Sequence, residues 1–289
     1  MKKILAVVSA LAVAISALPV LAQSPAGTNA QLATPGTTQT LVLPAAAGNA
    51  KVISLGTAID PQSGRLVEGY AIIKHKPATA KPSNPGNGHG GNNGGGGSTC
   101  YAFLAKDAKW KTNEPWLINP SNSQGLDENT LAATVATSIA KWEDAADGTV
   151  DDNGFLDIIG SGNTTSAILE ADTTNPDGAN EVYFGSIADA NAIAVTIVWG
   201  IFGGPPAGRE LVEWDQIYDQ TDFDWSLSGE TDKMDVENIV THELGHTFGL
   251  ADLYTTECAD ETMYGYGTEG ETKKRDLNTG DIIGINKLY

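Results

Sequence analysis

The stretch His242-Glu243-Leu244-Gly245-His246-Thr247-Phe248-Gly249-Leu250-Ala251-Asp252 carries the most informative pattern in the chain. Positions four apart on an α-helix share one face, so His242 and His246 can direct both imidazoles at one Zn²⁺ ion. Glu243 lies beside the first of them and can act as general base toward a water on that ion. A core helix that merely carries two histidines would leave this glutamate beside an apolar face without a partner. The pattern therefore predicts a catalytic zinc site on a helix over about residues 235–250.

The third zinc ligand must be sought downstream. The helix is expected to end at Gly249, a residue type suited to the left-handed position after a helix C-terminus. The chain has four histidines and none follows His246, so the remaining ligand must be an oxygen or sulfur donor. Asp252 follows His246 by six residues and has the favoured offset. Glu257 and Asp260 are alternatives that no motif supports.

The pattern His-Glu-x-x-His-x-x-Gly-x-x-Asp resembles the metzincin metalloproteases and is most similar to the matrixins among them. Thr262-Met263-Tyr264-Gly265-Tyr266 resembles the methionine turn beneath the zinc of that family. The final residues, 281–289, resemble the last matrixin helix. The resemblance covers about residues 100–289 and implies an α+β domain. Its parts would be a twisted mixed sheet with an edge strand for the substrate, an active-site helix, a methionine turn and a C-terminal helix.

The resemblance implies a zinc endopeptidase that cleaves protein or peptide substrates, and the N-terminal residues described below lead us to expect that it is secreted. The residues that match the family pattern are the zinc ligands His242, His246 and Asp252, the general base Glu243, and Gly249 and Met263 as structural support. Two features depart from the matrixin pattern. Asp252 replaces the usual third histidine, as in snapalysin-type enzymes, and Gly265 replaces a proline that helps to shape the S1′ pocket. The alternatives are a catalytically inactive zinc-binding recognition module and a zinc amidase acting on cell-wall peptide.

Hydrophobic periodicity predicts two further helices, over residues 127–146 with Asp127 as N-cap and over the last ten or so residues with Thr279 as a candidate N-cap. Apolar runs predict strands at residues 116–118, 181–184, 193–199 and 211–214. The run at 193–199 is either the edge strand on which a metzincin binds extended peptide or an ordinary buried strand, since periodicity does not separate the two.

The N-terminal part predicts export and a pro-segment. Residues 1–22 combine two lysines, an apolar run and a small-residue cleavage site, which is typical of a signal peptide rather than a transmembrane anchor. Residues 23–85 are expected to be a pro-segment. They contain a hairpin of strands at 51–55 and 66–73, which is too small to be stable alone and must pack on something larger. The Gly/Asn-rich linker 86–99 separates this zymogen segment from the catalytic domain 100–289.

The two cysteines, Cys100 and Cys258, favour one disulfide in an exported chain over two free thiols. Closing so long a loop would stabilise the fold by roughly 5 kcal/mol before strain. The matrixin cysteine-switch motif Pro-Arg-Cys-Gly is absent from the chain.

Charge narrows the choice of partners. Residues 100–289 hold 34 acidic and ten basic side chains, a net charge of −24, which disfavours nucleic acid and anionic lipid. We therefore expect a secreted, extracellular monomer with no nucleic-acid partner and no membrane partner after signal cleavage. The acidic run at 144–157 is either a structural Ca²⁺ loop or a solvated acidic loop. It does not match an EF-hand.

Overall fold

The computed structural model describes residues 40–44, 50–77, 100–148, 150 and 156–289. The predicted signal peptide 1–22 and the linker 86–99 lie outside the described residues. Of the predicted pro-segment 23–85, the described residues are 40–44 and 50–77.

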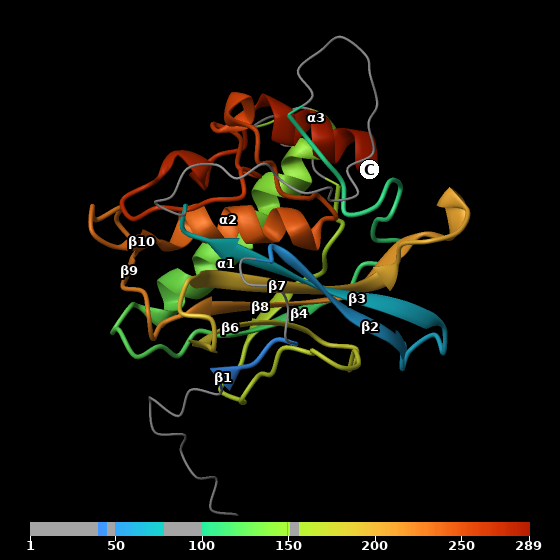
Figure 1. The fold of residues 1–289 in the computed structure, drawn as a ribbon, viewed down its shortest axis with the longest axis horizontal. Helices are drawn as coiled ribbons and strands as arrows, with labels where there is room; N and C mark the ends of the chain where they lie inside the picture. The colour runs from blue at the N-terminus through green and yellow to red at the C-terminus, as the bar shows by residue number, and fades with distance from the viewer. Residues whose placement is uncertain (1–39, 45–49, 78–99, 149, 151–155) are drawn as a thin grey trace, which may run out of the picture. The chain divides into compact units, whose positions relative to one another are not determined.

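One mixed β-sheet runs through the described chain (Figure 1). In sheet order its strands are β2 (Val52–Ile59), β3 (Leu66–His75), β7 (Ala192–Ile201), β8 (Glu210–Asp219), β6 (Asn180–Ile187), β4 (Trp116–Asn119) and β5 (Gly162–Thr164), with β1 (Thr40–Leu41) on β6. Strands β2, β3, β7 and β8 pair antiparallel, and β8, β6, β4 and β5 pair parallel. A short pair, β9 (Trp225–Ser226) and β10 (Met234–Asp235), leads into the helix that carries the zinc motif.

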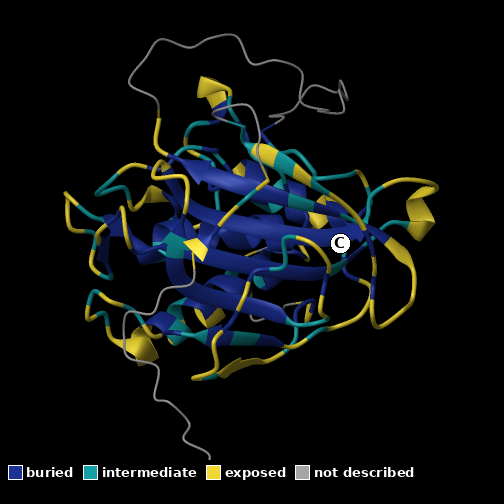
Figure 2. Ribbon diagram, turned by 60° about the horizontal axis from the view of Figure 1, so that its bottom comes forward, coloured by how far each residue is buried: buried dark blue, intermediate teal, exposed yellow. Residues whose placement is uncertain are grey.

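Within the described residues the α-helices are α1 (Glu128–Ala145), α2 (Val236–Thr247) and α3 (Thr279–Leu288), and 3₁₀ turns lie at Pro206–Gly208, Thr256–Cys258 and Lys273–Arg275. Helices α1 and α2 lie on one side of the sheet (Figure 1). The central strands and the faces of α1 and α2 that pack together are buried, whereas β5, much of β2 and the loops are exposed (Figure 2). The α+β architecture expected from the sequence is confirmed. Among the described residues, no helix combines the length and the apolar character needed to cross a bilayer.

Strand β7 does not lie at an edge of the described sheet. Its residues are buried almost throughout, and β3 pairs with it antiparallel from Glu68–Gly200 to His75–Ala192. The predicted hairpin therefore forms, and it packs on β7, the strand for which the sequence left open a substrate-binding edge or an ordinary buried position. The backbone groups of β7 that face away from β8 are paired by β3 instead of being open.

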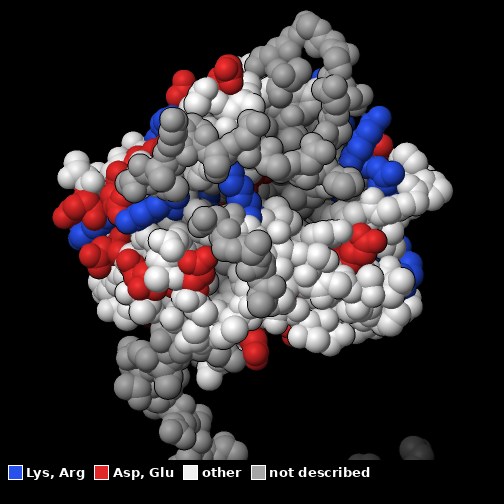
Figure 3. Space-filling model, in the orientation of Figure 1, with Lys and Arg blue, Asp and Glu red and all other residues white. Residues whose placement is uncertain are grey.

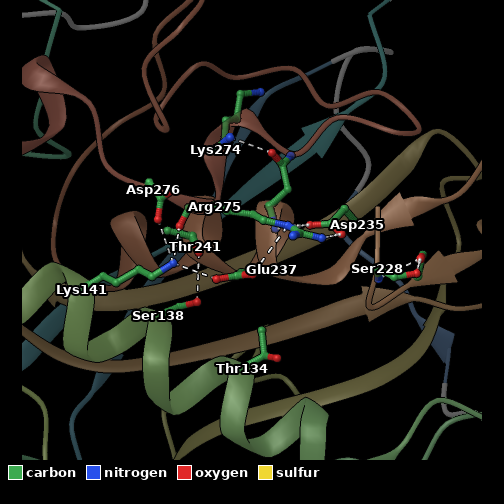
Figure 4. Close-up of polar contacts among 12 residues, drawn as sticks. Thr134, Ser138, Lys141, Ser228, Asp235, Glu237, Thr241, Lys274, Arg275 and Asp276 are labelled. Carbon is green, nitrogen blue, oxygen red and sulfur yellow. Dashed lines mark hydrogen bonds and ion pairs between the residues drawn. The ribbon is translucent and has the colours of Figure 1, made fainter. Parts of the chain in front are cut away.

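Helix α1 packs on α2 through the stripe that its periodicity predicts. Leu131, Val135, Ile139 and Trp142 are all buried. The Trp142 Nε1 donates to the Thr241 carbonyl at 2.8 Å, and the Ser138 and Thr241 hydroxyl oxygens lie 3.0 Å apart (Figure 4). Asp127 caps α1 as predicted, accepting a hydrogen bond from the Thr130 N–H at 2.8 Å.

The start of α2 is fixed by an ion pair. Asp235 is its N-cap and accepts from the Asn238 N–H at 3.0 Å. Arg275 donates two hydrogen bonds to the same carboxylate, from Nε at 2.8 Å and from Nη2 at 2.6 Å (Figure 4). Lys141 of α1 donates to Glu237 Oε1 at 2.7 Å, so α1, the first turn of α2 and the turn 273–275 are held together.

Helix α3 begins at Thr279, one residue earlier than a cap at Thr279 would give. Asn278, not Thr279, is the N-cap, and it forms a capping box with Asp281. Either side chain could cap a helix, and Asn278 makes an additional tertiary contact, because its amide donates to the Asp260 carbonyl at 2.5 Å. The predicted disulfide between Cys100 and Cys258 is present, with a Cα–Cα distance of 5.3 Å.

Candidate metal centre

His242 and His246 lie on consecutive turns of α2 with their rings 5.0 Å apart and nearly perpendicular. Asp252 comes from the loop after the helix. Its Oδ1 lies 3.1 Å from His242 Nε2 and 3.6 Å from His246 Nε2. One atom from each of the three residues thus falls within a single small volume.

The loop reaches this position because Gly249, directly after the C-cap Phe248, terminates α2. Its φ of +100° is left-handed, and a Cβ there would come 2.9 Å from the Ala108 carbonyl oxygen. The Gly249 N–H donates to the His246 carbonyl and the Leu250 N–H to the Gly245 carbonyl, both at 2.9 Å. This is the Schellman arrangement, and it turns the chain back over the helix end.

Backbone carbonyls select the tautomer of both histidines. His242 Nδ1 lies 2.5 Å from the Thr262 carbonyl oxygen, and His246 Nδ1 lies 2.9 Å from the Leu250 carbonyl oxygen. Since a carbonyl only accepts, each Nδ1 carries the proton and each Nε2 presents a lone pair to Asp252. Burial, with Lys74 as a further cause, lowers the pKa of His242 to about 3, so its imidazole is neutral at physiological pH.

The buried acceptor atoms of this cluster would be stabilised by a cation between them. His242 Nε2 and Asp252 Oδ1 are fully buried, and neither has a hydrogen-bond partner among the described residues. Two acceptors at 3.1 Å, with no proton between them, repel each other unless a positive ion lies nearby. Two imidazole nitrogens and one carboxylate oxygen form a donor set that suits zinc, so the residues present fit the metal.

Glu243 lies beside this cluster, with one carboxylate oxygen near the histidines and the other bound to β7. Its Oε1 is 3.9 Å from His242 Nε2 and accepts no hydrogen bond within the described chain. Its Oε2 accepts from the Thr196 hydroxyl of β7 at 2.6 Å. Burial raises the pKa of Glu243, partly opposed by His246 and Lys74. One carboxylate oxygen is therefore anchored and the other is free to exchange a proton.

Tyr254 is a site residue that the sequence analysis missed. Its hydroxyl donates to Asp252 Oδ2 at 2.7 Å, which leaves Oδ1 turned toward the histidines. Gly265 makes room for this ring, because a Cβ at Gly265 would fall 2.3 Å from Tyr254 Cε1. The packing of the Tyr254 ring therefore explains why position 265 holds a glycine and not the proline of the matrixin pattern. The position of Tyr254 two residues after Asp252 was a signal in the sequence that could have identified it. Thr196 is 47 residues from Glu243, and the sequence gave no signal of their contact.

Met263 lies buried beneath α2 in the turn predicted for it. Its N–H donates to Asp281 Oδ1 at 3.1 Å, and the preceding Thr262 N–H donates to Asp281 Oδ2 at 2.7 Å. The first turn of α3 therefore holds the turn that positions His242.

The alternative third ligands do not reach the cluster. Glu257 is exposed, and the Asp260 carboxylate, 91% exposed, pairs with Lys273 Nζ at 3.1 Å. Cys258 is in the disulfide.

The acidic run at 144–157 is described only in part, because 149 and 151–155 lie outside the described residues. A different carboxylate group lies elsewhere: ligand atoms of Asp172, Asp177 and Glu213 fall within 4.8 Å of one another. Glu213 Oε1 and Asp172 Oδ2 are buried without a hydrogen-bond partner in the described part of the chain. Burial, with mutual repulsion, raises the pKa of Glu213 to about 9 and that of Asp172 to about 6. Like-charged oxygens this close are suited to a hard cation.

Elsewhere the acidic charge is broken up by basic side chains, and both signs lie side by side on the face drawn in Figure 3. Lys233 with Glu230 and Lys273 with Asp260 are two such pairs. This face of the molecule is therefore not uniformly negative.

Comparison with known proteins gives a family match in the second half of the chain. The family model described as matrixin matches residues 205–289. Among solved structures, the chain is similar to metalloproteinase-II from Bacteroides fragilis, with 14% identity and a TM-score of 0.33. The match covers 71% of this chain and 58% of that one, which is less than two thirds of its length. No curated protein matches the sequence.

Proposed function

We propose that this chain is a secreted zinc metalloendopeptidase with a matrixin-like metzincin domain, made as a zymogen, and that it cleaves peptide bonds with Glu243 as general base. The matrixin match at residues 205–289 supports this proposal. The single observation that supports this most is the convergence of His242 Nε2, His246 Nε2 and Asp252 Oδ1 beside an unanchored Glu243 oxygen. The matrixin match includes all four of these residues.

Three residues of the chain would bind the metal. His242, His246 and Asp252 would hold the zinc, and the carbonyls of Thr262 and Leu250 keep both Nε2 lone pairs directed at it. Bound there, zinc would supply a Lewis acid that polarises the peptide carbonyl and makes a water more acidic.

Glu243 would move the proton. Its Oε1 takes a proton from the attacking water and later delivers it to the leaving amine. The Thr196 hydroxyl on Oε2 restrains the carboxylate, so the receiving oxygen stays turned toward the reacting atoms. Such positioned proton transfer typically contributes about 10²–10⁴-fold to the rate.

Calcium is proposed at Asp172, Asp177 and Glu213, and its role would be structural. In support, three carboxylates converge there and two of their oxygens are buried without donors in the described structure. Extracellular calcium sites bind in the range of about 10⁻⁴–10⁻³ M, which matches a secreted protein.

The experiment is metal analysis of the purified secreted chain together with a casein digest, before and after cleavage of the linker 86–99. One zinc per chain and casein cleavage in either form is the expected result. Zinc without cleavage in both forms would instead favour the inactive recognition module. Edman sequencing of the secreted protein tests signal cleavage after Ala22.

A further inference from the structure

Strand β3 is bound on both of its sides. On one side it pairs antiparallel with β7, with Lys74 opposite Ala194. On its other side its last residue, His75, forms a parallel bridge with Tyr266, and the His75 carbonyl accepts from the Gly267 N–H at 3.3 Å. A segment that continues a sheet on one side and bridges a loop on the other has the geometry of a peptide bound by strand addition.

This strand ends beside the metal centre. It pairs with β7, and β7 contributes Thr196, whose hydroxyl binds Glu243. The loop on its other side directly follows Met263 and holds Gly265, against which Tyr254 packs. The two segments that flank the end of β3 thus also contact Glu243, through Thr196, and Tyr254, which binds Asp252.

The Lys74 side chain fills a pocket between these segments. It is 1% exposed, and its Nζ donates to the Tyr264 carbonyl at 2.7 Å. Its stem lies against Gly267, where an added Cβ would come 3.4 Å from Lys74 Cε and 3.0 Å from Ile239 Cδ1 of α2. Ile239 is one turn before His242, so the pocket adjoins the ligand-bearing part of the helix.

The charged groups around Lys74 are of both signs. Lys274 faces it from the turn 273–275, while Asp252, Glu243 and Glu271 counter that repulsion. Burial lowers the pKa of Lys74 well below its usual range. A buried lysine at this position is costly for a strand with only a structural role, since an apolar side chain would avoid the desolvation.

Two further lysines hold the hairpin across the site. Lys51 Nζ lies 3.0 Å from the centroid of the Tyr254 ring, and the Lys51 carbonyl accepts from the Ile73 N–H at 2.9 Å. Lys76, directly after β3, pairs with Glu269. The hairpin therefore contacts the tyrosine that orients Asp252 and the loop beyond the methionine turn.

We propose that residues 66–76 occupy the substrate-binding groove of this enzyme as a resident peptide, with Lys74 in the side-chain pocket beside the metal centre. The inference rests on the proposed function and adds how the enzyme is kept latent and which peptides it accepts. A substrate must displace this strand, and a peptide with a lysine at the corresponding position fits the pocket that is vacated.

The test uses the full chain with Glu243→Ala, which prevents turnover, and a fluorescent peptide with the sequence of residues 70–77. Gly69→Val loosens the strand away from the pocket, because a Cβ at Gly69 would fall 2.6 Å from the Trp199 ring. Lys74→Asp removes the anchor itself. The matched controls are Gly208→Val, where a Cβ meets open space, and Lys106→Asp at an exposed position.

Both variants are expected to bind the peptide at least about tenfold more tightly than the parent, since the tethered strand no longer competes at high effective concentration. Hydrogen exchange should show faster exchange in residues 52–75, with cooperative melting retained. A peptide carrying Glu in place of Lys74 should bind weakly, and the controls should match the parent.

Unchanged peptide binding with folded variants would overturn the proposal. So would loss of cooperative melting in both variants, because a displaceable strand can leave without unfolding the rest. These readouts need no hydrolysis. Variants that bind the peptide, in a protein that never cleaves casein, would contradict the proposed function and leave this inference standing.

Discussion

Gly245 lies directly above Met263, and a Cβ on Gly245 would fall 2.1 Å from the Met263 sulfur. The glycine inside the zinc motif therefore lets the methionine turn approach the helix between the two histidines. This approach brings the Thr262 carbonyl within 2.5 Å of His242 Nδ1. The close contact between the helix and the turn thus helps to direct a ligand.

Gly245→Ala should therefore destabilise the fold and weaken metal binding together. Overpacking of a filled core typically costs about 1–3 kcal/mol, and the displaced turn would release His242 Nδ1. Urea unfolding and zinc competition with a chelator measure the two effects. Gly208→Ala, in open space, serves as control. A stable variant with parental zinc affinity would show that the contact is not needed.

Tyr254→Phe should weaken zinc binding without affecting folding. The hydroxyl that orients Asp252 is lost, and outer groups of this kind typically contribute about 10–100-fold to metal affinity. Chelator competition on the full chain gives the affinity, and thermal melting checks the fold. Tyr264→Phe leaves the hydroxyl on Asp252 in place and should retain parental affinity. Equal affinities in both variants would argue against a role for Tyr254.

Calcium should raise the melting temperature through Glu213. At about 100 times the dissociation constant, binding stabilises by about 2.7 kcal/mol, which corresponds to roughly 5–10 °C for a domain of this size. Glu213→Gln should reduce that rise, whereas Asp232→Asn at an exposed position should not. Differential scanning fluorimetry with and without added Ca²⁺ gives the shifts. An equal response of Glu213→Gln and the parent would place calcium elsewhere.

Acid should loosen the hairpin through Glu210. The Arg65 guanidinium at the start of β3 hydrogen-bonds Glu210 and lowers the pKa of that carboxyl below its ordinary 4.5, with Lys111 adding to the effect and burial opposing it. The contribution is present above about pH 4.5 and is lost as the pH falls through the lowered pKa.

Glu210→Gln should thus speed hydrogen exchange of residues 52–75 by a few-fold at pH 7, since exposed pairs contribute about 0.2–1 kcal/mol. After correction for intrinsic rates, the difference from the parent should shrink as the pH falls from 4.5 through the lowered pKa of Glu210. A difference that stays constant throughout acid titration would show that the charge of Glu210 is not the cause.

The sequence predicted the elements whose pattern is local. The apolar stripe of α1 and the cap Asp127 lie within one helix, and the spacing of His242, His246 and Asp252 lies within one helix and its following turn. The disulfide followed from an even cysteine count. The cap of α3 was displaced by one residue, to Asn278, whose additional tertiary contact is not visible in the local pattern.

What could not be predicted depends on segments far apart in the chain. Both hairpin strands were identified, but nothing local says that β3 pairs with β7 and thereby covers the candidate substrate edge. Strand β5 (Gly162–Thr164) is exposed and short, so it shows no periodicity. The contact of Thr196 with Glu243 joins a sheet strand to a helix, and only the assembled fold brings them together.

The central claim is that Asp252 holds the metal while Glu243 moves the proton. Zinc per chain after dialysis, measured beside peptide hydrolysis in the Gly69→Val background, tests it most directly. Glu243→Ala should keep one zinc and lose about 10²–10⁴-fold in turnover. Asp252→Ala should lose zinc, and Asp252→His should retain it. Full zinc and full activity in Asp252→Ala would contradict the account and return Glu257 and Asp260 to consideration.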